Sequence, residues 1–141
     1  MTAYMMPTME AGAALARRGI EGPVVMLNLL RLRDVADYSA SPELAPETPI
    51  SGRDAFDLYI AHTLPLLRDS GGELLFLGDG GAFLIGPPEE KWELAMLVRQ
   101  HSVERFFAFA QDEAIMAGIG HRTAAIKDAR LLPLVETGLA G

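Results

Sequence analysis

Hydrophobic and polar residues follow two periods along this chain, and these periods divide it into strands and helices. Near-continuous apolar runs at residues 24–33 (VVMLNLLRLR) and 92–99 are typical of central strands covered on both faces. Extended stretches at residues 73–85 predict another strand, and residues 130–135 (RLLPLV) predict a last one. Because Pro133 lacks an N–H group, we expect this last strand at a sheet edge.

Helical periodicity separates the strands. Thr8 can cap a short N-terminal helix that runs to about Arg18, within an extension that covers residues 1–22. Ser51 and Asp54 have the spacing of a capping box, and they begin a longer helix in which Pro65 predicts a bend. Its core face has the sequence spacing expected of an amphipathic helix, at Phe56, Tyr59, Ile60, Thr63, Leu64 and Leu67.

The second half of the chain predicts two further helical stretches. Ser102 can cap the first, and a continuation at residues 112–126 is weakened by Gly118 and Gly120. The element order is then β-α-β-β-α-β after the N-terminal helix, which is the split βαβ pattern of a ferredoxin-like α+β fold. This pattern places the first and third strands at the centre of one antiparallel sheet, with the helices on one face.

The other sheet face stays apolar in the two central strands, and the two helices of the pattern can cover only one face. The simplest cover is the same face of a second copy, which predicts a homodimer with twofold symmetry. We therefore interpret residues 1–141 as one domain of the dimeric α+β barrel kind.

Two segments leave choices open. Asp79-Gly80-Gly81 is compatible with a tight hairpin or with a bulge in one long bent strand, and we favour the bent strand because the next segment supplies its partner. Residues 34–50 contain three prolines and form a long irregular loop, and loops of this length often cover a binding site.

Composition narrows the possible functions. The chain has no cysteine, which excludes disulfides, thiolate metal sites and a cysteine nucleophile. Its net charge of −7, without a cluster of lysines and arginines, disfavours nucleic acids and anionic membranes as partners. The first residues lack the pattern of a signal peptide, and no apolar run is long enough to span a membrane, so we expect a cytoplasmic protein.

Several short segments in the right order resemble the family called domain of unknown function 1330. They are VVMLNLLRLR, ADYSA, PELAP, ISGRDAFDLYI, GGELLF, KWELAMLVRQHS and GHRTAAIKDARLLPL, and they cover residues 24–135. The resemblance implies a dimeric α+β barrel and places a family arginine at Arg122. Gln100-His101 and QDEAI at residues 111–115 depart from the family pattern, in which tyrosines are usual, so a pocket lined by these positions differs in this chain.

Two polar residues are candidates for binding a ligand. Asn28 lies within an apolar central strand, where its amide either bonds a neighbouring backbone group or orients a ligand in a cavity between sheet and helices. Tyr59 lies on the core face of its helix, where it is either a half-buried aromatic or a hydroxyl that points into a pocket.

Charged residues near the ends of elements are further candidates. A pocket lined by Arg99 and Arg122 could hold a carboxylate, and His121 could exchange a proton with the ligand. The alternative role of Arg122 is a structural salt bridge to Asp34 or Asp37.

The sequence predicts no metal site, because the three histidines fall in different elements. We expect no cofactor, although a haem ligand at His121 stays an alternative. Three functions follow: a cofactor-independent enzyme acting on a small aromatic or carboxylated metabolite, a non-catalytic ligand-binding or accessory protein, and a haem-binding barrel.

Overall fold

A four-stranded antiparallel sheet forms one layer of the structure, and helices form the other. The computed structural model describes residues 3–138. The strands are β1 Val24–Leu32, β2 Glu73–Ala82, β3 Lys91–Gln100 and β4 Ile126–Leu134. The helices are α1 Met9–Arg17, α2 Gly52–Asp69, α3 Val103–Gln111, α4 Glu113–Met116 and α5 Ile119–Ala125, with a 3-10 turn η1 at Pro42–Leu44.

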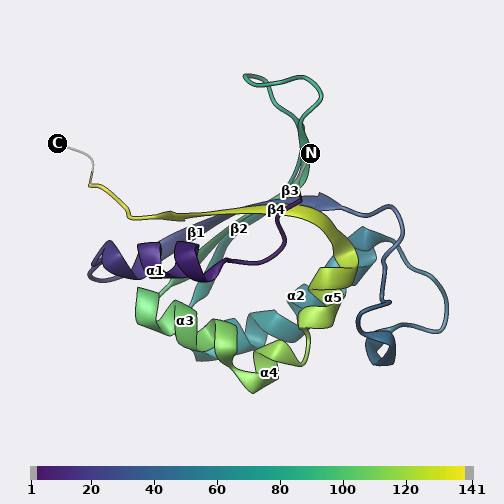
Figure 1. Ribbon diagram of the computed structural model, residues 1–141, viewed down its shortest axis with the longest axis horizontal. Coiled ribbons are helices and arrows are strands. Elements are labelled where there is room, and N and C mark those ends of the chain that lie inside the picture. The colour runs from purple at the N-terminus through teal and green to yellow at the C-terminus, as the bar shows by residue number, and fades with distance from the viewer. Residues whose placement is uncertain (1–2, 139–141) are drawn as a thin grey trace.

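The strand order is β2-β3-β1-β4, which confirms the ferredoxin-like α+β fold with the first and third strands in the centre. Pro133 lies in the edge strand β4, as its missing N–H predicts. All helices lie on one side of the sheet in Figure 1. None of the helices in the described part of the chain is long and apolar enough to cross a membrane.

The helix starts follow their capping residues. Thr8, Ser51 and Ser102 each accept a hydrogen bond from a backbone N–H in the first turn of α1, α2 and α3. The helical stretch predicted at residues 112–126 is divided into α4 and α5, because the chain turns at Ala117 and Gly118. β4 starts at Ile126, earlier than predicted, because α5 leads into it without a loop.

The interpretation of residues 73–82 as one strand is confirmed. β2 pairs with β3 from Glu73 to Ala82, and its irregularity lies between Leu74 and Phe76, not at the glycines. A Cβ atom at Gly80 would lie 2.3 Å from the Trp92 carbonyl oxygen, so only glycine fits where the two backbones approach. The outer part of this hairpin, residues 80–92, is called the arm here, and it projects away from the helices (Figure 1).

Side chains from β1 alternate between the two sheet faces. Val24, Met26 and Leu30 are buried under the helices: Val24 and Met26 pack with Leu15 and Val103, and Leu30 packs with Phe56 and Leu94. The opposite face, called the open face here, receives no helix. From the strand register its apolar residues are Val25, Leu27, Leu29, Phe76, Ala95, Leu97, Leu132 and Leu134.

The chain before α1 is tied to β4 by a polar cluster, called the Asp128 cluster here. The Asp128 carboxylate accepts hydrogen bonds from the N–H groups of Tyr4 and Ala129 at 2.9 Å and from Arg130 Nη1 at 2.7 Å. The Arg130 guanidinium lies 4.8 Å from the centre of the Tyr4 ring and 5.0 Å from that of Trp92. The Ala129 N–H also donates to the Tyr4 carbonyl at 2.8 Å. This anchoring leads residues 5–7 along the gap between β4 and the helices.

Candidate functional site

A cavity of about 190 Å³ lies between the helix-covered face of the sheet and the helices. The sheet forms its floor, α2 and α3 form two walls, and the α4–α5 segment together with residues 6 and 7 closes the side next to β4. Most of its lining is aliphatic, aromatic or methionine, and four of the seven methionines take part. The polar residues that line it are Asn28, Tyr59, Thr63, Gln100 and Arg122. A mostly apolar cavity with a few convergent polar groups is typical of a small-molecule site.

Two of these polar residues stand on the floor. Asn28 is 9% exposed and Gln100 is 2% exposed, and both belong to central strands. The Asn28 side chain donates from Nδ2 to the Met26 carbonyl at 3.2 Å, so one of the two roles predicted for it, a bond to neighbouring backbone, is present. Because Asn28 also lines the cavity, its contact with a ligand stays a prediction.

Two further polar residues come from α2, one turn apart. Tyr59 and Thr63 have the i, i+4 spacing that brings side chains onto one helix face. Burial raises the pKa of the Tyr59 hydroxyl, and the positive charge of Arg122 and the neighbouring Thr63 hydroxyl lower it in part. Tyr59 is therefore a neutral hydrogen-bond donor at physiological pH.

Two buried atoms in the cavity have no hydrogen-bond partner within the described residues. They are Thr63 Oγ1 and Gln100 Oε1, and their side chains are 7% and 2% exposed. An unpaired buried polar atom costs about 1–3 kcal/mol. A molecule bound in the cavity can form hydrogen bonds with these two atoms. Their presence in one cavity therefore favours a binding site.

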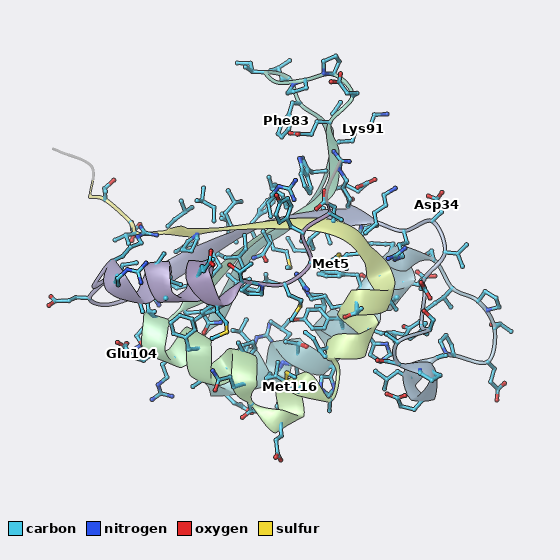
Figure 2. All side chains as sticks on the ribbon, in the orientation of Figure 1. Met5, Asp34, Phe83, Lys91, Glu104 and Met116 are labelled. Atoms are coloured by element: carbon cyan, nitrogen blue, oxygen red, sulfur yellow. The ribbon has the colours of Figure 1, made fainter. Side chains whose placement is uncertain are left out.

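Arg122 reaches the cavity from α5 and contacts the segment before α1. Its Nη1 donates to the Met5 carbonyl at 3.0 Å and lies 3.7 Å from Met6 Sδ. Figure 2 shows Met5 on the helix side of the sheet, where this contact closes the cavity. Burial lowers the pKa of Arg122 and the nearby Tyr59 raises it in part, while the guanidinium stays protonated.

No ion pair joins Arg122 to a carboxylate within residues 3–138. The alternative salt bridge to Asp34 or Asp37 is not formed, and Asp37 instead accepts a hydrogen bond from the Ser39 N–H at 3.0 Å. Arg122 is thus a partly buried cation that keeps donors available next to Tyr59. Such a guanidinium is well suited to bind a carboxylate.

His121 does not share the cavity with Arg122, and the expectation that they act in one pocket is corrected here. Successive helical residues point about 100° apart, so His121 leaves α5 toward the loop that precedes α2. Its Nδ1 lies 2.8 Å from the Tyr38 hydroxyl, with the two rings edge to face at 5.6 Å. Burial and the neighbouring His62 lower its pKa, which favours the neutral ring that accepts this bond.

Arg99 also lies outside the cavity, which corrects the prediction of a pocket shared with Arg122. It pairs with Val25 and Glu73 on the open face and is exposed, because successive strand residues point to opposite faces. The next residue, Gln100, occupies the cavity position that the prediction gave to Arg99. The long loop of residues 34–50 packs on α5 and contributes no residue to the lining.

Sequence reasoning missed Gln100 and Thr63 as site residues. A signal was present for both: Gln100 stands where the resembled family usually has tyrosine, and Thr63 is the polar member of an apolar helix face. Within residues 3–138 no group of three acidic or histidine side chains could hold a metal ion.

Comparison with solved structures identifies relatives of this chain. It is similar to RPA0582 from Rhodopseudomonas palustris, with 30% identity and a TM-score of 0.85, over 98% of this chain and 100% of that one. A structure of methylated RPA0582 gives 31% identity and the same TM-score over 98% of both chains. The chain belongs to the RPA0582 family. RPA0582 is described as a protein of unknown function.

A more distant structure, from Bacteroides fragilis, is described as a dimeric protein of unknown function with a ferredoxin-like fold. It shares 12% identity over 79% of this chain and 94% of its own, and its TM-score of 0.49 supports no argument about this one. A search against protein-family models found no match, and a search of the curated proteins found none. These comparisons indicate no ligand, so the lining of the cavity is the basis for proposing one.

Proposed function

We propose that this protein binds a small, largely apolar molecule that carries one carboxylate or carbonyl group, held by Arg122 and Tyr59. The observation that carries this proposal is the set of unpaired polar atoms inside an apolar cavity. An engineered cavity of about 150 Å³ holds benzene, so a cavity of about 190 Å³ suits a molecule with one ring or a short chain.

The proposal needs no cofactor. The cavity volume is near that of a benzene site, which is far too small for a porphyrin, and His121 points outside it toward Tyr38. Titration with haemin tests this part, and a shifted absorption band that disappears in His121→Ala would contradict it.

Binding of benzoate, monitored on ¹³C-labelled methionine methyl groups, tests the main proposal. We expect shifts at Met26, Met96 and Met116, which line the cavity, and none at Met9, which is exposed on α1. Removing a guanidinium that pairs with a carboxylate should weaken binding roughly tenfold or more, so Arg122→Met should show this loss.

Two control variants locate the effect. Arg105→Met removes an exposed arginine from α3, and Arg99→Met removes one from the open face; both should bind benzoate like the wild type. Equal losses in all three variants, or no shift at millimolar benzoate in the wild type, would refute a carboxylate site at Arg122.

Turnover is a second candidate, favoured by the Tyr59 hydroxyl beside the Arg122 charge. Such a pair of donors can stabilise negative charge that develops on a carbonyl oxygen. The described lining residues include no carboxylate or imidazole, so we favour binding over catalysis as the function. Incubating wild-type protein and Tyr59→Phe with each molecule that binds, and following it by NMR, tests for conversion.

We also propose that two copies of this chain pair through the open face, as in a dimeric α+β barrel, and that the RPA0582 family falls within the wider family of domain of unknown function 1330. The open face carries apolar residues from all four strands, with exposed Phe76 and Leu132 at its sides. Leu84 in the arm is fully exposed, and the arm projects from the sheet on the side away from the helices (Figure 1).

Charge on the open face also favours a second copy. Arg99 on β3 and Glu73 on β2 pair with each other in the sheet and are both exposed on this face, and Glu93 lies on β3. A twofold arrangement can bring the acidic groups of one copy to the arginines of the other. Light scattering should give a dimer for the wild type and for Leu58→Glu on α2, and a monomer for Leu132→Glu. A wild-type monomer at micromolar concentration would refute the pairing.

A further inference from the structure

The cavity has two polar ends of opposite hydrogen-bonding character. At one end Arg122 and Tyr59 offer N–H and O–H donors, next to residues 6 and 7. Toward the other end Gln100 Oε1 is a buried acceptor without a partner in the described part of the chain, and Thr63 Oγ1, one helical turn from Tyr59, also lacks one there. A ligand with acceptors alone could satisfy the first end but would leave Gln100 unpaired.

The strand framework sets the position of Gln100 on the cavity floor. Tyr59 and Thr63 are neighbours on α2, one turn or about 6 Å apart along the helix axis, and the Thr63 hydroxyl lies close enough to lower the pKa of Tyr59. Gln100 pairs with Val24 in the sheet, four residues along β1 from Asn28, which corresponds to about 13 Å at the spacing of a strand. Between the ends the lining is apolar, with Ile60 and Met96 facing the same space. The site therefore has room for a single ring or short chain between its polar ends.

We propose that the cavity selects a two-ended ligand, with an anionic group against Arg122 and Tyr59 and a hydrogen-bond donor at the opposite end that reaches Gln100 and Thr63. A monocyclic aromatic acid with a hydroxyl or amino group opposite the carboxylate has this chemistry. This inference rests on the proposed function, because it assigns the second end of the same site.

The specificity follows from the cost of unpaired polar atoms. A ligand without the donor buries Gln100 Oε1 further and leaves it unsatisfied, whereas a ligand hydroxyl pairs it. Sites built to bond a ligand hydroxyl discriminate strongly against the analogue that lacks it. Gln100 and Thr63 are thus specificity-determining residues, and Arg122 supplies affinity for both molecules.

Binding of 4-hydroxybenzoate and of benzoate, compared by calorimetry, tests this inference. For one added hydrogen bond we expect the wild type to prefer 4-hydroxybenzoate by about tenfold. Gln100→Met, which keeps side-chain length, should remove most of that preference, because it weakens 4-hydroxybenzoate binding and removes the unpaired acceptor that benzoate buries. Gln111→Met, an exposed change of the same kind at the end of α3, should keep the preference.

A second variant guards against a fold defect at Gln100. Thr63→Val has nearly the same shape, and it should also reduce the preference while benzoate binding stays dependent on Arg122. Equal affinity for both molecules in the wild type, with benzoate still dependent on Arg122, would overturn the two-ended ligand while the proposed function stands. Failure of both molecules to bind would overturn both proposals.

Discussion

The Asp128 cluster and the cavity polar groups are both largely buried, yet they differ in whether their hydrogen bonds are complete. Asp128 accepts three bonds, and the Arg130 side chain that bonds it lies between two aromatic rings. In the cavity, Thr63 Oγ1 and Gln100 Oε1 have no hydrogen-bond partner among residues 3–138. The two regions lie on either side of the segment before α1.

This difference separates a structural network from a binding site. Burial alone would raise the pKa of Asp128, but the bonds from Tyr4, Arg130 and Ala129 outweigh it and lower the pKa. The carboxylate is therefore held charged by the fold itself. The cavity groups do not help to hold the fold in this way, and their unpaired state lowers the stability of the free protein.

Asp128→Ala should have the largest effect on stability of the changes considered. It removes three hydrogen bonds and leaves the Arg130 guanidinium without its carboxylate, for an expected loss of about 3 kcal/mol in the free energy of unfolding. Urea unfolding at fixed protein concentration measures it, and Asp69→Ala, at an exposed site in α2, is the control. A loss below that of the control would mean that the cluster is not a structural network.

Thr63→Val should have the opposite sign. Because the wild-type hydroxyl has no partner, replacing it with a methyl group should stabilise the ligand-free protein by about 1 kcal/mol. Thr123 is the matched control, since its Oγ1 donates to the Ile119 carbonyl at 3.3 Å, and Thr123→Val should not stabilise. If Thr63→Val destabilises the protein in the same urea experiment, the Thr63 hydroxyl forms a hydrogen bond in solution, which contradicts its unpaired state.

The smallest expected effect concerns His121, which belongs to neither region. Burial holds the pKa of folded His121 below the ordinary histidine value of 6.5, so the unfolded chain binds the proton more tightly. The contribution of neutral His121 is complete above pH 6.5 and is lost as the pH falls below it. His121→Asn, which can still accept from Tyr38, should therefore lose less stability than the wild type between neutral and mildly acidic pH.

Thermal unfolding in a series of buffers measures this difference in slope. Tyr38→Phe serves as the partner variant, because it removes the hydroxyl and keeps the ring. Identical pH slopes in wild type and His121→Asn would show that the Tyr38–His121 contact does not hold the ring neutral.

Local patterns were sufficient to predict most of the fold. The apolar runs of β1 and β3 predict central strands, Pro133 predicts the edge, and Thr8, Ser51 and Ser102 mark helix starts. These signals depend on backbone hydrogen bonding and on side-chain period, which are properties of neighbouring residues. The start of β4 was missed because residues 126–129 carry no strand alternation.

The composition of the cavity was predicted in part. Asn28, Tyr59 and Arg122 were expected to line a pocket, and the structure brings these three together, whereas Arg99 and His121 point elsewhere. A shift of one residue along a strand or helix decides which face a side chain occupies, and the sequence alone did not fix that register. Gln100 lines the cavity and Arg99 does not, because successive residues of a strand point to opposite faces of the sheet.

The sequence by itself thus determined the order of elements, the central and edge positions of the strands and the apolar character of both sheet faces, because each depends on contacts between near neighbours. Only the tertiary structure decided that Thr63 of α2 and Gln100 of β3 line one cavity, and that neither Thr63 Oγ1 nor Gln100 Oε1 has a hydrogen-bond partner within the described residues. That result depends on how two layers from distant parts of the chain are spaced, and a linear pattern does not contain this distance.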